Sequence, residues 1–185
     1  GYGDAEVLIT YANGKEDTSK VVSDIKSYNK KVMMQRLDIR NLSKKDLQVL
    51  IEFKPTHIYY YATPFIFRGI SGQFSKDLYG DFLKFYVDAF KIIVETIAHS
   101  SVNNQVKFFY PSSIALDDRP QDMLEYTRAK TEGEALCKTL ESLYKNIKIY
   151  NPRLPRMETD QTVSLANVQN EDPMKIIDTL RLMRI

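Results

Sequence analysis

Tyr126 and Lys130 are the two residues whose types and spacing point most directly to chemistry. Side chains four residues apart lie one above the other on a helix face. A lysine ammonium one turn away favours a phenolate, so we expect Lys130 to lower the tyrosine pKa from its ordinary value of about 10. Ser113 precedes them at the end of an apolar run, with Ser112 as the alternative. A hydroxyl there can hold a substrate oxygen while Tyr126 gives or takes its proton.

The elements that must position these residues follow from the apolar pattern. Strand-like and helix-like segments alternate along the chain, which is typical of an α/β fold with a parallel sheet. The strand segments are nearly continuous in apolar residues, as expected when both faces of a sheet are covered. Strands are predicted over 7–12, 31–39, 56–64, 105–111 and 147–151. Helices are predicted over 18–28, 76–100 and 123–144. A further helix is expected to be capped by Ser43 and to end just before Pro55.

With a serine, a tyrosine and a lysine in this order, the chain resembles the short-chain dehydrogenase/reductase family. The resemblance covers nearly the whole sequence and aligns 7–12 with the second strand of the family. It implies a doubly wound, Rossmann-like parallel sheet and an NAD(P)H-dependent carbonyl or keto reductase, or alcohol dehydrogenase. It also implies the roles of three residues: Tyr126 as general acid, Lys130 as the group that tunes it and holds the ribose hydroxyls, and Ser113 as the contact to the substrate oxygen.

The same resemblance assigns residues to a nicotinamide cofactor. The end of the strand 7–12 carries no carboxylate, and a nearby amide and lysine could hold a 2′-phosphate, so NADP(H) is favoured over NAD(H). Asp38 also fits an ordinary turn-forming residue. The predicted cofactor contacts are Asn13 and Lys15 at the 2′-phosphate, Asp38 and Ile39 at the adenine, Ala62, Thr63 and Lys130 at the nicotinamide ribose, and Pro155 and Thr159 at the carboxamide.

The chain departs from the family pattern in several places. Tyr86 stands where relatives often carry an asparagine, and Arg156 replaces the glycine that usually follows Pro155. The first strand with its glycine-rich, phosphate-binding loop is missing, and so is the last strand. We therefore interpret residues 1–185 as one incomplete domain, part of a longer, multidomain polypeptide or completed by a separate piece.

Two other functions remain open. The domain could be a catalytically silent scaffold or a nucleotide sensor, which the missing loop favours and the joint presence of Ser113, Tyr126 and Lys130 disfavours. It could also be a sugar-nucleotide epimerase or dehydratase with the same three residues. Those relatives carry a larger C-terminal substrate domain, and few residues follow Asp160 here.

Composition narrows the partners. The net charge is +2 with 27% charged residues and no basic stripe, so no nucleic acid is expected. No apolar run approaches the ~18 residues of a membrane span. The single cysteine, Cys137, fits a reducing compartment, and we expect a cytoplasmic protein. His57 and His99 lack partners at metal-ligand spacing. The expected partners are a small carbonyl or alcohol substrate, other domains of a parent chain, and a second copy bound through the helices 76–100 and 123–144.

Overall fold

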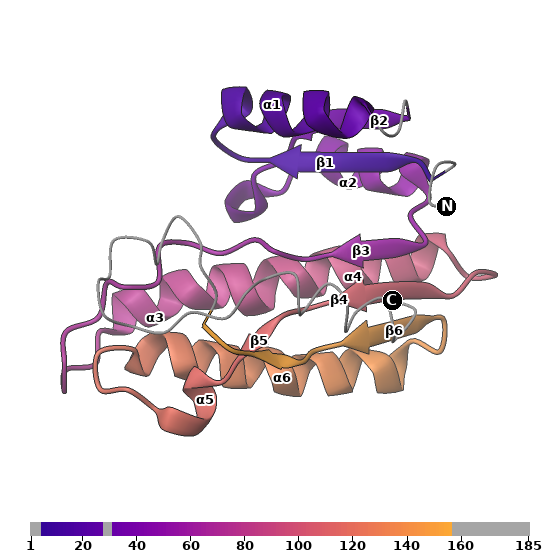
Figure 1. The fold of residues 1–185 in the computed structure, drawn as a ribbon. Coiled ribbons are helices and arrows are strands. Elements are labelled where there is room, and N and C mark those ends of the chain that lie inside the picture. Colours follow the sequence, from indigo (N-terminus) through magenta and orange to yellow (C-terminus); the bar gives the residue numbers. More distant parts are fainter. Residues whose placement is uncertain (1–4, 28–30, 157–185) are drawn as a thin grey trace. The chain divides into compact units, whose positions relative to one another are not determined.

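The structure is a computed structural model that describes residues 5–27 and 31–156. The chain divides into two compact units, Gly1–Phe53 and Lys54–Ile185, and each is described here by itself. In both units the strands of the described ranges pair in parallel and alternate with helices (Figure 1). The predicted α/β fold with parallel strands is confirmed.

The first unit is a two-stranded parallel sheet with its connecting helices. The strands are rich in β-branched and long apolar residues, and pair in register from Val7↔Val32 to Tyr11↔Arg36. Gly14 precedes the first helix with a φ of 69°, a left-handed conformation that a glycine adopts without strain. The elements are β1 (Val7–Tyr11), α1 (Lys15–Lys26), β2 (Val32–Arg36), the 3₁₀ turn η1 (Ile39–Asn41) and α2 (Lys44–Phe53).

Ser43 caps α2, as predicted. Its hydroxyl accepts a hydrogen bond from the backbone N–H of Asp46 at 3.2 Å, and its own N–H donates to the Asp46 carboxylate at 2.9 Å. This reciprocal pair satisfies donors that the first turn of a helix leaves free.

The second unit is built on a three-stranded parallel sheet in the order β3–β4–β6. The central strand has Phe108 and Phe109 at 0% and 1% exposure, so both of its faces are covered. Beyond it a short parallel pair extends the same path, with Ser113 opposite Leu154. The elements are β3 (His57–Tyr59), β4 (Val106–Phe109), β5 (Ser112–Ser113), α5 (Ala115–Asp118), β6 (Ile147–Tyr150) and β7 (Arg153–Leu154).

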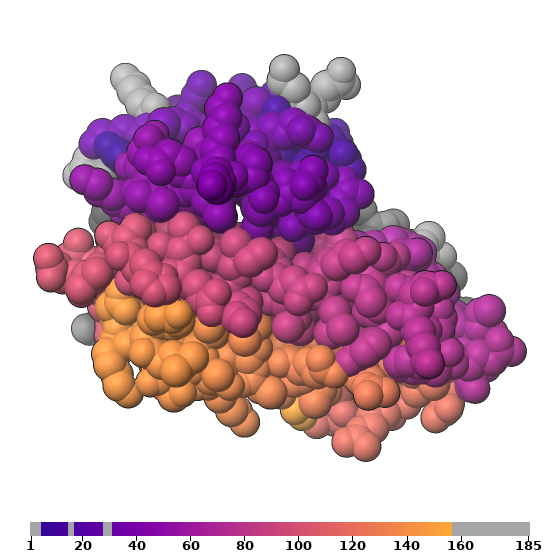
Figure 2. All heavy atoms as spheres, turned by 180° about the vertical axis from the view of Figure 1, so that it is seen from behind, coloured from indigo at the N-terminus to yellow at the C-terminus, as the bar shows by residue number. Residues whose placement is uncertain are grey.

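Two long helical segments lie side by side in the second unit (Figure 1), and they share one surface when the molecule is seen from behind (Figure 2). They are the helices predicted over 76–100 and 123–144. The dimer predicted through them stays a prediction. The first segment comprises α3 (Lys76–Leu83), the π-helical turn η2 (Lys84–Asp88) and α4 (Ala89–Ser100), and the second is α6 (Leu124–Leu143).

Four details differ from the sequence prediction. The helix predicted over 18–28 begins three residues earlier, at Lys15, and ends at Lys26. The helix predicted over 76–100 contains the π-helical turn η2, whereas an uninterrupted α-helix was expected. The strand predicted over 56–64 is shorter: β3 covers His57–Tyr59, and the next backbone bond to β4 is from the Tyr60 N–H to the Phe109 carbonyl at 2.9 Å. The strand predicted over 31–39 ends at Arg36, since the Asp38 carboxylate accepts from the Arg40 N–H and caps a 3₁₀ turn. The predicted missing last strand lies outside the described residues.

Candidate functional site

The candidate site lies at the carboxyl ends of β3, β4 and β5 in the second unit. Parallel strands present these ends at one edge of the sheet, where the side chains that follow them come together. Ser113 ends β5, and its hydroxyl accepts from the Ala115 N–H at 3.2 Å. The neighbouring Ser112 is buried and donates instead to the Glu134 carboxylate at 2.6 Å. Of the two serines, Ser113 is the one whose hydroxyl is hydrogen-bonded with Tyr126.

Tyr126 stands in the first turn of α6 and is only 7% exposed. Burial raises the pKa of its phenol, and a hydrogen bond with Ser113 opposes that rise in part. The tyrosine therefore keeps its proton at neutral pH. The sequence prediction that Lys130 lowers the pKa of Tyr126 is wrong for this structure, because burial outweighs every other influence on the phenol.

Lys130 lies one turn further along α6 and is also 7% exposed. Its Nζ donates to the carbonyl oxygen of Pro111 at 2.6 Å. Burial disfavours the ammonium form and lowers the pKa of this lysine from 10.5 to about 7. The Lys130 amine can thus gain or lose a proton near neutrality, which an exposed lysine does not do.

Tyr86 joins the two residues from the opposite helix. Its ring centroid lies 4.1 Å from the Lys130 Nζ and 5.7 Å from the Tyr126 ring, in an edge-to-face arrangement. Its hydroxyl is 2.5 Å from the Thr63 hydroxyl, after β3. The geometry therefore brings together Thr63, Tyr86, Tyr126 and Lys130 within one cluster.

The π-helical turn η2 sets the position of Tyr86. Two further tyrosines hold this turn: the Tyr60 hydroxyl donates to the Phe85 carbonyl at 2.6 Å, and the Tyr110 hydroxyl donates to the Tyr86 carbonyl at 2.9 Å. Gly133 on α6 gives the Tyr110 hydroxyl its room, since a Cβ there would come within 2.0 Å of it. π-Turns inside helices are frequent at functional sites.

An ion-pair network fixes the β5–β7 pair against α6. Arg153 donates from Nε and Nη2 to the two oxygens of Glu134, each at 2.8 Å, and from Nη1 to Asp117. Ser112 donates to the same glutamate. Glu134 follows Lys130 by one turn, so these bonds hold the strand bearing Ser113 to the helix bearing Lys130. Sequence reasoning missed this network, although a glutamate four residues after Lys130 was visible.

The predicted cofactor residues are distributed over both units. In the second, Ala62 and Thr63 follow β3 and Pro155 follows β7, all at the edge that carries Ser113. Thr159 lies outside the described residues. In the first unit, Asn13 is exposed and Lys15 begins α1, while Asp38 and Ile39 lie at the start of η1.

Asp38 already has a partner in this structure. Both of its carboxylate oxygens accept from the Arg40 guanidinium, at 2.9 and 2.6 Å, and these hydrogen bonds lower the pKa of the aspartate. The turn-forming interpretation of Asp38 therefore has a structural basis, and an adenine contact would have to form beside this ion pair.

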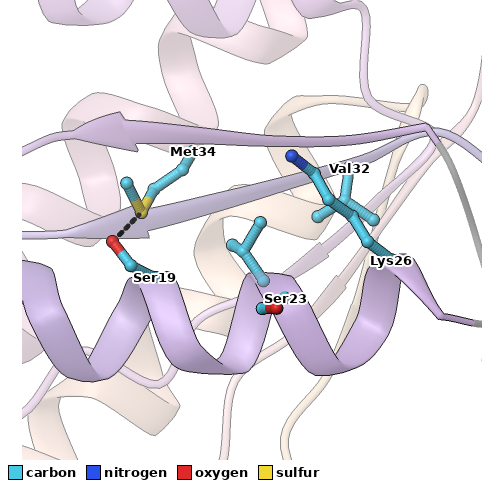
Figure 3. Close-up of a pocket in the computed structure, with 6 residues that line it drawn as sticks. Ser19, Ser23, Lys26, Val32 and Met34 are labelled. Carbon is cyan, nitrogen blue, oxygen red and sulfur yellow. Dashed lines mark hydrogen bonds between the residues drawn. The ribbon is translucent and has the colours of Figure 1, made fainter.

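A hollow of about 300 Å³ lies between α1 and β2 of the first unit (Figure 3). The Ser19 hydroxyl reaches the Met34 sulfur across it at 3.8 Å. None of the predicted site residues lines it: the lining side chains are Ser19, Val22, Ser23, Lys26, Val32 and Met34.

Neither a cluster of metal-ligand residues nor a membrane-spanning helix occurs in the described part of the chain. Its His, Cys, Asp and Glu residues form no group of three or more that could hold a metal ion. No helix in it is both long enough and apolar enough to cross a membrane.

No protein-family model matches this chain, and no curated protein is similar to it in sequence. Solved structures are similar in fold. An alcohol dehydrogenase from the archaeon Thermococcus sibiricus, complexed with 5-hydroxy-NADP, superposes with a TM-score of 0.79 at 12% identity, over 97% of this chain and 80% of that one. An acetoin dehydrogenase from Enterobacter cloacae gives 0.77 at 14% identity, over 96% and 78%.

A short-chain dehydrogenase from Burkholderia cenocepacia in complex with NADP gives a TM-score of 0.76 at 10% identity, over 96% of this chain and 73% of that one. At identities this low, the structural similarity shows the fold alone, and any activity has to be argued from the residues of the site. The Rossmann-like fold implied by the sequence resemblance is confirmed.

Proposed function

We propose that this chain, which has the fold of the short-chain dehydrogenases/reductases, acts as an NADP(H)-dependent oxidoreductase on a small carbonyl compound or its alcohol. The observation that carries the proposal is the burial of Tyr126 and Lys130 against one ring, that of Tyr86. Burying an amine costs free energy, and a surface pair on a helix would not incur that cost. Titratable groups whose pKa values are shifted by burial, gathered in one cluster, are candidates for a functional site.

The chemistry follows from the proton states. In reduction, the Ser113 hydroxyl holds the carbonyl oxygen and the Tyr126 hydroxyl gives it a proton. Because burial raises the pKa of Tyr126, the phenol is protonated at neutral pH and ready to act as this acid. Lys130, with a pKa of about 7, can then return a proton to the tyrosine. A bound nicotinamide would supply the hydride that reaches the carbonyl carbon.

The donors in the second unit fit a nicotinamide ribose. An ammonium has three N–H donors, and the described residues take one from Lys130, at the Pro111 carbonyl. Two remain for ribose hydroxyls. The preference for NADP(H) rests on Asn13 and Lys15 in the first unit and agrees with the cofactors named for the similar structures.

Replacing Tyr126 by phenylalanine tests the catalytic role. Removal of a positioned general acid lowers kcat by about 10²- to 10⁴-fold, so Y126F should lose most NADPH oxidation over a panel of small ketones and aldehydes. NADPH affinity should stay within about twofold, because the ring remains. Tyr144→Phe, at the end of α6, is the matched control and should keep full activity. Equal rates for Y126F and the wild type would refute the assignment.

A silent, nucleotide-binding domain is the second candidate, and one observation favours it. Lys130 already donates to Pro111 and lies over Tyr86, so the buried lysine has structural partners without a ligand. This candidate requires NADPH binding in titration calorimetry, unaffected by Y126F, with no turnover of any carbonyl compound. The epimerase or dehydratase alternative depends on residues after 160, which lie outside the described ranges.

A further inference from the structure

Arg156 has hydrogen-bond donors without an acceptor in the part of the chain that the structure describes, two residues after the strand β7. Within the described residues, its Nε and Nη2 are buried and have no hydrogen-bond partner. A buried charged donor without an acceptor loses its hydration and gains nothing in return, which is among the costlier arrangements in a folded protein. Such a donor suggests that an acceptor arrives with a ligand.

The two unpartnered nitrogens form one side of the guanidinium. The N–H bonds of Nε and Nη2 are parallel and match the two oxygens of a carboxylate or phosphate. Arg153, three residues earlier, uses the same side in this way: its Nε and Nη2 each lie 2.8 Å from a different oxygen of Glu134. The Nε–Nη2 side thus binds a carboxylate in Arg153 and has no acceptor among the described residues in Arg156.

Phe67 holds the Arg156 guanidinium from the loop that follows β3. The Arg156 Cζ lies 5.5 Å from the Phe67 ring centroid, a cation–π distance. The loop itself is fastened beside Tyr126: Glu125 accepts from the Ser75 N–H, and the Gly72 N–H donates to the Gln121 carbonyl at 3.0 Å. The arginine is therefore supported by a segment tied to the start of α6.

Strand register places Arg156 two residues beyond the strand pair that carries Ser113. Leu154 lies opposite Ser113, and its carbonyl accepts from the Ile114 N–H at 3.0 Å. Arg156 follows two residues later, at the end of the strand pair that carries Ser113. A molecule whose oxygen rests on Ser113 can therefore present a second, charged group to Arg156.

We propose that the Nε–Nη2 side of Arg156 binds an oxyanion, a carboxylate or a phosphate, on the molecule that occupies this site. The inference rests on the proposed function for its substrate class: the carbonyl compound is anionic, or the oxyanion is a cofactor phosphate. Both sources offer the same pair of oxygens, and binding measurements separate them.

The test compares levulinate, a ketone with a carboxylate, with its neutral methyl ester, by ligand-observed NMR titration of the full chain. NADPH affinity is measured alongside. The variants are R156Q and R156K. The matched control is R128Q, because Arg128 also stacks on aromatic rings, 5.1 Å from Tyr79 and 5.5 Å from Phe74.

We expect the wild type to bind levulinate more tightly than the ester, and R156Q to weaken levulinate roughly 10- to 100-fold without changing the ester, as for a lost charge-assisted pair. R156K keeps the charge without the paired N–H groups, so it should lose part of the affinity for levulinate. It replaces R156Q as the test variant if R156Q does not fold. R128Q should bind like the wild type. A loss of NADPH affinity in place of levulinate affinity assigns the oxyanion to the cofactor.

Equal wild-type affinity for levulinate and its ester, together with unchanged NADPH affinity in R156Q, would overturn the proposal. Its failure is separable from failure of the proposed function, because binding needs no turnover. Y126F should stop turnover and keep levulinate binding. Binding through Arg156 without turnover of any carbonyl compound would refute the oxidoreductase alone.

Discussion

The two units differ in how deeply they bury their candidate functional residues. In the second unit, Tyr126 and Lys130 are 7% exposed and border a core whose aromatic side chains are fully buried. In the first unit, Asn13 is exposed and α2 buries none of its residues completely. The buried apolar side chains among its described residues are Val22, Val32 and Leu37, at 6–7% exposure.

This difference matches two requirements of the proposed function, proton transfer and recognition of the cofactor. Proton transfer needs groups with shifted pKa values, and burial supplies the shift for Tyr126 and Lys130. Binding of a 2′-phosphate, which the proposed function also requires, depends on hydrogen-bond donors and positive charge at the binding surface. In the proposed function, the second unit would supply the groups that transfer protons, and the first would supply exposed polar groups such as Asn13.

Cavities in the two cores should have the largest effects and should differ. The ring centroid of Phe90 lies 4.5 Å from that of Tyr110 and 5.0 Å from that of Tyr60, and the residue is 0% exposed. F90A should destabilise the second unit by about 3–5 kcal/mol. V22A in the first unit should cost only about 1–2 kcal/mol, because it removes two methyl-sized groups beside a hollow that water can enter.

Urea denaturation followed by circular dichroism measures both losses, and hydrogen exchange locates them. F90A should raise exchange in β4 and α4, while V22A should raise it in β1 and α1 alone. Equal losses of stability in the two variants would contradict the contrast between the units.

Lys130 should make stability depend on pH. The unfolded lysine titrates near 10.5 and the folded one near 7, so between these values the folded chain binds fewer protons. Stability must then rise with pH in this window, by about 2 kcal/mol from pH 7 to pH 9. Below pH 7 the buried lysine is charged and its full cost is present. K130M, with an apolar chain of similar length, should abolish the rise.

The control for Lys130 is an exposed lysine of the same helix, Lys138. K138M should keep the rise in stability between pH 7 and pH 9 that the wild type shows. A wild-type curve that is flat over this interval, or a rise that persists in K130M, would show that the lysine is not the buried group that titrates.

Tyr86 should affect the site through its ring more than through its hydroxyl. Y86F removes the bond to Thr63 and should cost about 1 kcal/mol of stability, with the ring still over Lys130. Y86L removes the ring too, and the ammonium then loses a cation–π contact of about 1–2 kcal/mol. The pKa of Lys130 should fall by about one unit further in Y86L and stay unchanged in Y86F.

The midpoint of the pH dependence of stability reports that pKa in each variant. The same shift in Y86F and Y86L would assign the effect to the hydroxyl and contradict a role for the ring.

The sequence predicted most of the second unit because its patterns are local. Apolar runs marked β4 and β6, the spacing of Phe82, Phe90 and Ile97 marked the helical segment over 76–100, and the Tyr–Lys spacing placed both side chains on the face that meets Tyr86. Capping of α2 by Ser43 was also predictable from one short motif.

Features set by tertiary contacts were not predictable. The π-turn at η2 depends on hydroxyls of Tyr60 and Tyr110, which come from strands distant in sequence. A lowered pKa of Tyr126 was predicted from the proximity of Lys130 alone, but burial raises the pKa of this phenol. The unfilled side of Arg156 depends on what the fold leaves near it, which no local pattern records.

The smallest expected effect lies in the first unit, at Asp38. Its ion pair with Arg40 is at the surface, where solvent screens it, so D38N should leave the urea midpoint unchanged within error at neutral pH. The hydrogen bonds from Arg40 lower the pKa of the aspartate, so the small stabilisation that exists is lost only as the pH falls through that lowered value.

Asp38 and Arg40 together separate a cofactor contact from a structural cap. If Asp38 meets the adenine, D38N should weaken NADPH binding about three- to tenfold, as for one lost polar contact, while R40Q should leave the affinity unchanged. If Asp38 only caps η1, both variants should bind NADPH like the wild type. Titration calorimetry on the two variants decides between them. Because this unit buries few side chains around Asp38, we expect a loss of this residue to lower the affinity for NADPH and to leave the free energy of unfolding unchanged.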